Sequence, residues 1–290
     1  MLILGSHWVS LYLNSLLFGG LICLFLLVLG HLFKGPEWRE GKVRSWKISW
    51  LDFGFLLWLM FLTVVLSSLI TDSLSVTVSP GEGEAGIWKD ISGGLTMHAA
   101  LFAVFGYFLL FKRSLFTDPI NSQSISVSKA LASGGFMLLA AIPAIAATGI
   151  GWQYCILLLR SWGIDLPTAP QPLVVVLSDD LPALERSMLI FLAVFTAPIA
   201  EELIFRACIY RFFKARFGAI NAMFVSSLLF GLIHFNLSSL PSLIILGIFL
   251  SISYERAGNL MAPIFFHALF NMNSIILIFL LDDVGLNGPF

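Results

Sequence analysis

Two adjacent carboxylates stand inside a strongly apolar segment of this sequence. The segment, Ala200–Arg206, has the sequence AEELIFR. Successive residues of a helix point about 100° apart, so Glu201 and Glu202 face different neighbours. Glu202 and Arg206 are four residues apart and lie on the same side, in the order that favours an ion pair. This pairing leaves Glu201 without a charge partner in its own helix, which suits a general base.

Two further apolar segments each bring a histidine to one helical face. Phe230 and His234 are four residues apart, and Gly231 beside them thins the helix, which allows another backbone or a substrate to approach closely. His267 and Asn271 have the same spacing in a later segment. Hydrogen-bond donors of these two types, aimed at one point, can hold a developing oxyanion. With the unpaired glutamate, these side chains supply the parts for activating water and polarising a carbonyl group.

The composition places these polar groups in a membrane protein. Of 290 residues, 58% are hydrophobic and only 11% are charged, whereas about 25% charged residues are usual in a soluble domain. The mean hydropathy is +0.94, so lipid is the solvent that suits this chain. The net charge of -1 comes with no basic tract to neutralise phosphates, which argues against nucleic acid as a partner.

The apolar segments predict an all-α polytopic membrane protein with about eight transmembrane helices. The predicted spans are Trp8–Phe33, Leu51–Thr71, Gly94–Phe111, Ala130–Leu159, Ser187–Tyr210, Ala219–Phe235, Pro241–Tyr254 and Pro263–Leu281. The fourth is too long for one straight crossing, and Gly149–Gly151 could end it, with Trp152–Leu159 lying in the interface. The seventh is short and could be re-entrant, so seven spans is the main alternative.

The basic residues predict the orientation of the chain. With the N-terminus outside, most of the 16 Lys and Arg residues fall in inner loops, and only Lys89, Arg160 and Arg186 fall outside. This bias follows the positive-inside rule and predicts an even number of crossings, with both termini outside a plasma (inner) membrane. We expect no cleavable signal peptide, because Met1–His7 lacks Lys and Arg and the apolar run continues to Phe33.

The rest of the chain contains few polar groups in its apolar segments. His98 stands alone in the third span, which favours a helix–helix hydrogen bond. The outer loop Ser161–Arg186 contains the apolar run Leu173–Leu177, which could be a strand, an interfacial segment, a substrate-docking surface or a packed cap. We therefore expect N-terminal membrane helices and loops in residues 1–180 and a catalytic helical core in residues 181–290.

The motifs EExxxR, FxxxH and HxxxN, on successive apolar segments, resemble the CAAX protease and bacteriocin-processing (CPBP) family. Its Rce1-like members are glutamic intramembrane proteases. The resemblance covers roughly Ala197–Asn273, about a quarter of the chain. It implies a membrane-embedded endopeptidase that needs no metal or other cofactor. Its substrate would be a peptide bond in a membrane-associated protein or in a prenylated, lipid-anchored tail.

The same resemblance implies a part for each polar residue. Glu201 would activate water, and His234 would help to hold that water. His267 and Asn271 would stabilise the tetrahedral oxyanion. The supporting residues would be Glu202, Arg206 and Phe230.

Other functions stay open. The sequence contains no HExxH and no GxSxG-type elbow, but Glu201, His234 and His267 could ligate zinc in a metal-dependent membrane protease. A catalytically idle relative could act as a membrane scaffold, an immunity factor or a regulatory factor. A transporter with a buried coupling carboxylate is a further alternative, although the two halves show no inverted-repeat pattern.

The spans also raise a question of depth. Straight helices of these lengths would separate Glu201 and His234 by about 10 Å along the membrane normal. We expect the fifth and sixth helices to extend past the inner surface near Phe212–Phe217, which would bring the two side chains together.

Overall fold

The computed structural model describes residues 2–33, 41–77, 84–111, 123–168, 171–178 and 181–283. All regular elements in these residues are helices, so the chain is an all-α polytopic membrane protein, as the composition predicts. Within the described residues, seven helices are long and apolar enough to cross a membrane.

The structure contains ten α-helices and two π-helical segments within the described residues. In order they are α1 (Leu2–Phe33), α2 (Trp50–Thr77), α3 (Glu84–Phe111), α4 (Val127–Ser161), α5 (Pro172–Ser178), α6 (Ala183–Phe191), η3 (Leu192–Thr196), α7 (Ala197–Glu202), η4 (Leu203–Tyr210), α8 (Arg211–Leu232), α9 (Leu240–Ala257) and α10 (Met261–Asp283). The elements η3 and η4 are π-helical, and they flank the short α-helix α7 that carries both glutamates.

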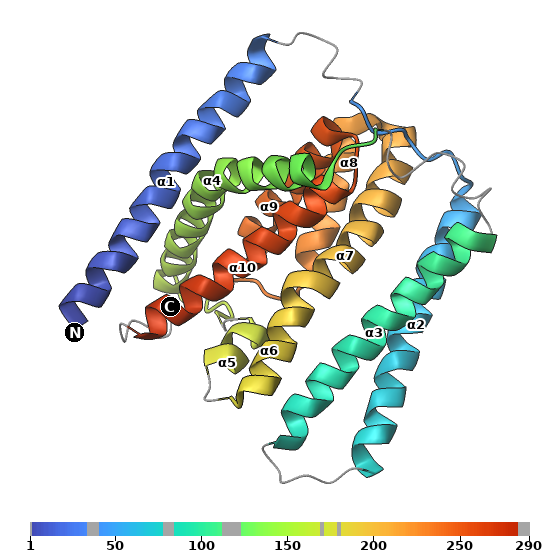
Figure 1. Cartoon of the computed structure of the whole chain (residues 1–290), viewed down its shortest axis with the longest axis horizontal. Coiled ribbons are helices and arrows are strands. Elements are labelled where there is room, and N and C mark those ends of the chain that lie inside the picture. The colour runs from blue at the N-terminus through green and yellow to red at the C-terminus, as the bar shows by residue number, and fades with distance from the viewer. Residues whose placement is uncertain are drawn as a thin grey trace.

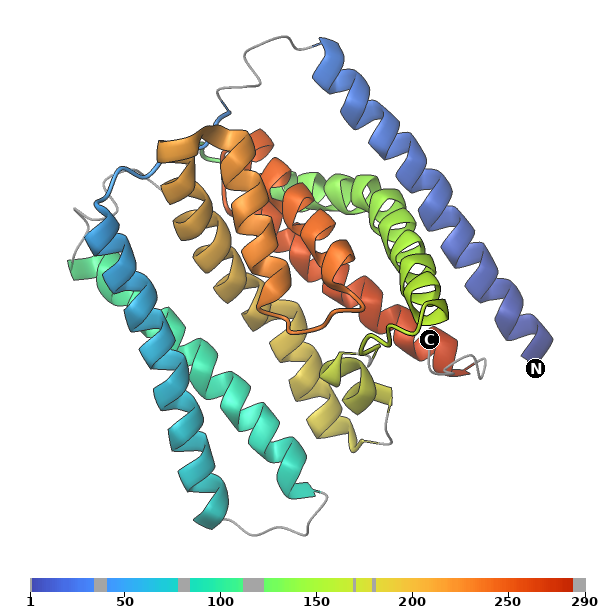
Figure 2. The same cartoon turned by 180° about the vertical axis from the view of Figure 1, so that it is seen from behind.

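The fifth apolar helix, Ala183–Leu232, turns back on itself. Its Gly218 has φ 78° and ψ 170°, a conformation that glycine adopts and other residues avoid. Figures 1 and 2 show α6, α7 and their π-helical neighbours forming one arm, with α8 returning beside them. Six of the seven apolar helices are single arms, and this one supplies two. The described residues therefore contain eight arms, the number of spans that the sequence predicts. The first arm continues past Tyr210 to Phe217. This is the extension of the fifth helix that we expect from the separation of Glu201 and His234.

Helix α4 is bent but unbroken. It stays helical through Gly149–Gly151 and on to Ser161, so the helix itself does not end at those glycines. Figures 1 and 2 show it changing direction part-way along. Pro143 lies inside the helix, and a proline there removes a backbone hydrogen bond and crowds the preceding turn. A Cβ added to Gly20 of α1 would lie 2.8 Å from Pro143 Cδ, so this glycine lets α1 pack closely against the bend.

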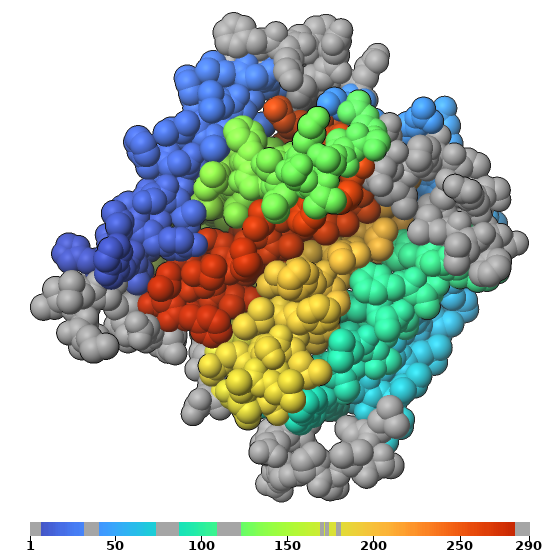
Figure 3. Space-filling model, viewed as in Figure 1, coloured from blue at the N-terminus to red at the C-terminus, as the bar shows by residue number. Residues whose placement is uncertain are grey.

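The helices around the glutamate-bearing arm form a bundle with two flanks. Helix α1 lies along α4 on one flank, and the hairpin of α2 and α3 forms the other (Figure 1). Helices α8, α9 and α10 surround the glutamate-bearing arm between these flanks. Figure 3 shows α10 at the surface between α4 and the α6–α7 arm. The bundle therefore places α9 and α10 directly against the arm that carries the two glutamates.

The apolar run Leu173–Leu177 is helical. It forms α5, and Leu177 is 2% exposed, in a cluster with Ile91 and Leu189. A strand, one of the alternatives for this run, is therefore excluded. Its packing against α3 and α6 agrees with the packed cap.

One end of the bundle holds an ordered strap, residues 41–49, between α1 and α2. The Lys214 ammonium donates to the Val43 carbonyl at 2.7 Å, and the Val43 N–H donates to Glu255 Oε2 at 3.1 Å. Lys214 also contacts Glu255 directly, and Arg211 Nε donates to the Arg44 carbonyl at 2.9 Å. The start of α1 and the last turn of α10 lie together at the opposite end (Figures 1 and 2).

Candidate active site

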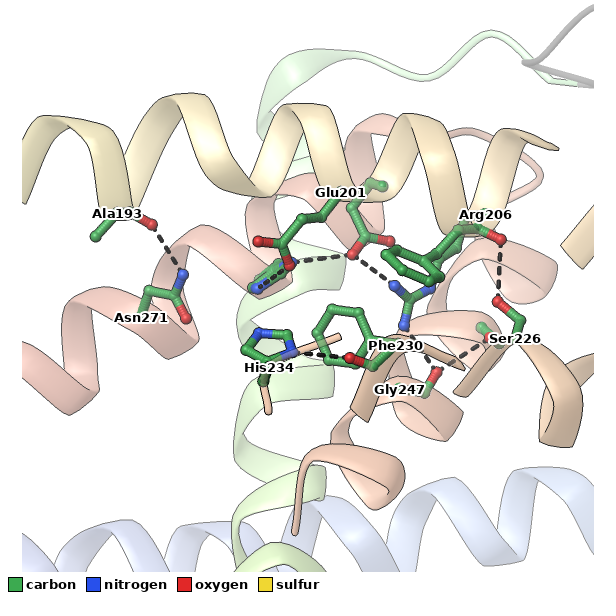
Figure 4. A network of polar contacts seen from close by, with 12 residues as sticks. Ala193, Glu201, Arg206, Ser226, Phe230, His234, Gly247 and Asn271 are labelled. Atoms are coloured by element: carbon green, nitrogen blue, oxygen red, sulfur yellow. Dashed lines mark hydrogen bonds and ion pairs between the residues drawn. The ribbon is translucent and has the colours of Figure 1, made fainter. Parts of the chain in front are cut away.

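Glu202 forms the predicted ion pair with Arg206 in the interior of the bundle. Its Oε1 accepts from Arg206 Nη1 at 3.0 Å, and both side chains are fully buried. Arg206 Nη2 donates to the Gly247 carbonyl of α9 at 3.1 Å. The guanidinium carbon also lies 4.7 Å from the centre of the Phe230 ring, close enough for a cation–π contact. These contacts, drawn in Figure 4, satisfy the charge of Arg206 without Glu201.

His267 lies between the two glutamates. Its Nδ1 is 3.0 Å from Glu202 Oε1, and its Nε2 is 3.8 Å from Glu201 Oε2. The ion pair with Arg206 marks Glu202 as a carboxylate, which only accepts, so His267 Nδ1 carries the hydrogen of this bond. The bond to Glu202 was not apparent from the sequence, because the partners lie on different helices.

Glu201 has a free oxygen. Its side chain is 21% exposed, yet Oε2 is buried and has no hydrogen-bond partner among the described residues. The nearest charged or titratable group recorded for it is the His267 imidazole. A partly accessible carboxylate with an unpaired oxygen beside an imidazole has the placement that a general base needs.

His234 lies two residues after the end of α8 and bonds back to the last turn of that helix. Its Nδ1 lies 2.7 Å from the Phe230 carbonyl oxygen, which can only accept, so Nδ1 carries a hydrogen and Nε2 of the neutral ring keeps its lone pair. The Phe230 ring is fully buried, with its centroid 4.9 Å from that of His234 and 5.6 Å from that of His267. Phe230 thus contacts both imidazoles and keeps them in one cluster with Glu201, as Figure 4 shows.

Asn271 points to a different part of the neighbouring arm. It lies one turn after His267 on α10, and its Nδ2 donates to the Ala193 carbonyl of η3 at 2.8 Å (Figure 4). His267 and Asn271 therefore share a helical face, as the spacing predicts, but one bonds a carboxylate and the other bonds a backbone carbonyl.

Small residues that the sequence analysis did not single out bring the surrounding helices close. A Cβ on Gly134 of α4 would lie 2.8 Å from the Phe266 backbone nitrogen, beside His267. A Cβ on Gly247 would lie 2.9 Å from Cα of Ser227. Ser226 donates to the Phe205 carbonyl at 3.0 Å. The available signal was the occurrence of small residues in apolar segments, which often mark close helix contacts in membranes.

Gly231, which the sequence did single out, faces α9. A Cβ there would lie 3.0 Å from Ile244 Cγ1 and 3.1 Å from Leu240 Cδ1. The backbone of α8 beside His234 is therefore approached closely by another helix, one of the two possibilities that the motif left open.

The residues proposed as zinc ligands do not form a recognisable metal centre. In the described part of the chain, no group of three or more His, Cys, Asp or Glu side chains is arranged to hold a metal ion.

Comparison with known proteins points to the part of the chain that holds this cluster. Residues 183–273 match the family model described as "Type II CAAX prenyl endopeptidase Rce1-like". That range contains every polar residue of the cluster just described. This core is similar to the Rce1-like family. It includes α6 through α8, α9 and the first half of α10.

A curated relative is similar to about a third of the chain. The protein named "Putative membrane peptidase YdiL" of Bacillus subtilis (strain 168) is 30% identical over 97 residues, which is 33% of this chain and 39% of the relative's length. No solved structure matches the chain. The helices α1 to α4 lie outside the Rce1-like range, although α4 packs against both α9 and α10.

Proposed function

We propose that the Rce1-like core is an intramembrane endopeptidase in which Glu201 activates water without a metal ion. The observation that supports this is the difference in contacts and exposure between the two neighbouring glutamates. Arg206 and His267 both bond Oε1 of the fully buried Glu202, while the 21% exposed Glu201 side chain has its Oε2 3.8 Å from His267 and without a hydrogen-bond partner among the described residues. A reacting carboxylate beside a fixed one is what acid–base chemistry requires.

The reaction is hydrolysis of a peptide bond. Glu201 takes a proton from water as the water oxygen bonds to the carbonyl carbon, and the carbonyl oxygen becomes an oxyanion. Glu201 then returns the proton to the leaving nitrogen as the carbon–nitrogen bond breaks. One water is consumed, and one carboxyl and one amine are formed, so the enzyme is unchanged.

The two histidines suit different parts of this reaction. His234, with Nδ1 committed to the Phe230 carbonyl, offers an Nε2 lone pair that accepts a hydrogen bond from the attacking water. Two carboxylates and one guanidinium leave the buried cluster with a negative charge, so a proton on His267 Nε2 would neutralise it. That proton is then a donor for the oxyanion. A similar contribution from Asn271 would need its second amide hydrogen, because the first is directed to Ala193.

The proposed substrate is a membrane-associated protein or a prenylated, lipid-anchored tail. The site lies within helices that span the membrane, and Glu201 keeps 21% exposure, so an extended peptide at the bilayer can approach it. The proposed location is a plasma (inner) membrane, with the N-terminus outside, because most basic residues then lie on the inner side.

The test is cleavage by purified full-length protein in liposomes. The substrates are a panel of membrane-anchored peptides, with and without a prenyl group. We expect Glu201→Gln to lower kcat by at least about 100-fold, whereas Glu185→Gln on the same arm retains activity. Activity of Glu201→Gln equal to wild type would refute activation of water by Glu201. Loss of activity with a chelator, restored by zinc, would assign the site to the metal alternative. No cleavage by wild type would favour the idle scaffold.

A further inference from the structure

The carbonyl of Ala193 has lost the backbone donors that a helix normally provides. Such a carbonyl accepts from the N–H four residues later in an α-helix, or five residues later in a π-helix. For Ala193 these residues are Ala197 and Pro198. The Ala197 N–H donates to the Leu192 carbonyl instead, and Pro198 has no N–H. Pro198 therefore explains both the π-helical turn and the orphaned carbonyl.

Asn271 supplies the missing donor from another helix. Its Nδ2 lies 2.8 Å from the Ala193 carbonyl oxygen, and Ala193 is 8% exposed. A buried carbonyl without a donor costs the energy of its lost hydration, so this bond is strongly favoured. It ties α10 to the glutamate-bearing arm at a fixed register.

That register determines where His267 meets Glu201. His267 and Asn271 are one turn apart on α10, and both contact the arm, with His267 Nε2 3.8 Å from Glu201 Oε2. We infer that Asn271 is a positioning residue for Glu201, acting through the carbonyl that Pro198 leaves free. The kinetic part of this inference rests on the proposed peptidase function.

The same π-helical segment is also fastened to α3. The Thr196 hydroxyl donates to the Leu192 carbonyl at 3.1 Å. A hydroxyl has one hydrogen to donate, so at 2.8 Å it accepts from Nδ1–H of His98. The helix–helix bond predicted for His98 is thus confirmed, and it reaches the turn that precedes Pro198. Segment η3 is held by α3 and α10 together, which restricts movement of the following turn that carries Glu201.

Restoring the backbone donor tests the inference. A residue other than proline at position 198 returns an N–H that can reach the Ala193 carbonyl, and Asn271 then becomes less necessary. We expect Asn271→Ala to lower kcat by about 100-fold in the wild-type background, the scale of a small misplacement of a reacting group. In the Pro198→Ala background the same change should cost about tenfold or less. An equal loss of kcat in both backgrounds would overturn the inference, because it would place Asn271 on the reacting atoms.

A second readout keeps this test separate from the proposed function. Thermal unfolding of the full-length protein in detergent measures the same four variants without substrate. Asn271→Ala should lower Tm clearly in the wild-type background and little in the Pro198→Ala background. Equal Tm losses would contradict the inference even if no substrate is cleaved. If Pro198→Ala fails to fold, Pro198→Ser supplies the same N–H. Failure of Glu201→Gln to reduce cleavage, with the Tm coupling intact, would reject the mechanism and retain the role of Asn271.

Discussion

His267 donates from Nδ1 to Glu202 Oε1 at 3.0 Å, although the catalytic candidate is the neighbouring glutamate. The same Glu202 oxygen accepts from Arg206 at 3.0 Å. Glu202 therefore holds both the cation that neutralises it and the imidazole that faces Glu201. Each carboxylate keeps one buried oxygen without a partner among the described residues. The two differ because Glu202 is fully buried and bonded to two donors, whereas the Glu201 side chain is 21% exposed.

Replacing Glu202 should cost stability, whereas replacing Glu201 should cost activity. Glu202→Gln leaves the fully buried guanidinium of Arg206 without an opposite charge, so we expect the free energy of unfolding to fall by about 3 kcal/mol. Glu201→Gln leaves that pair intact and should change stability little. Denaturant unfolding of the two variants in the same detergent measures the difference. Equal losses of stability would show that both glutamates are structural.

A glycine pair on α4 offers a test of how α10 is seated. A Cβ on Gly134 would lie 2.8 Å from the Phe266 nitrogen and 3.2 Å from the Ala262 carbonyl oxygen. Backbone atoms cannot rotate away, so Gly134→Ala should push α10 and its His267 outward. We expect a loss of about 1–3 kcal/mol in unfolding free energy, together with reduced peptidase activity.

The neighbouring glycine is the matched control. A Cβ on Gly135 would meet nothing within 4 Å, so Gly135→Ala should retain activity and stabilise the helix by about 0.5–1 kcal/mol. A loss of stability in both variants would mean that the helix itself, rather than its contact with α10, is sensitive to substitution.

Local spacing predicted the parts of the site that lie within one helix. The Glu202–Arg206 pair depends on a four-residue repeat, and the apolar segments gave the eight arms of the bundle. Contacts between helices were harder to foresee. The bond from Asn271 to Ala193 depends on which carbonyl Pro198 leaves free. It also depends on which turn of α10 lies against the glutamate-bearing arm. Neither quantity is contained in the spacing of side chains on a single helix.

The backbone directly after His234 carries a conformation that is unfavourable for its residue. Phe235 has φ 48° and is 96% exposed, so its side chain gives up little packing when it is removed. A left-handed conformation costs about 1–2 kcal/mol for a residue with a Cβ. Phe235→Gly should therefore raise the free energy of unfolding by about 1 kcal/mol, measured by denaturant unfolding in detergent.

The opposite substitution at another left-handed position provides the control. Gly258 has φ 64° and ends α9, donating its N–H to the Tyr254 carbonyl. Gly258→Ala should lower stability by about 1 kcal/mol or more, since the new Cβ would also lie 3.1 Å from Cβ of Lys42. If Phe235→Gly destabilises the protein instead, the exposed ring must make a contact that compensates for its backbone conformation.

The orientation of the chain can be tested from the two ends of α4. Ser124 precedes this helix and Ser161 ends it, and both are exposed. With the N-terminus outside, Ser124 lies on the inner side and Ser161 on the outer side. The native cysteines, Cys23, Cys155 and Cys208, are first replaced by serine so that a single new thiol reports its own position.

In intact cells, a membrane-impermeant maleimide should label Ser161→Cys at once and label Ser124→Cys only after the membrane is permeabilised. The physical reason is the concentration of Lys and Arg in the loops at the Ser124 end, which the positive-inside rule retains on the cytoplasmic side. Prior activity of each variant against the peptide panel controls for misfolding. Labelling of Ser124→Cys but not Ser161→Cys in intact cells would reverse the orientation. The buried cluster would be unchanged, but both termini would then be assigned to the inner side of the membrane.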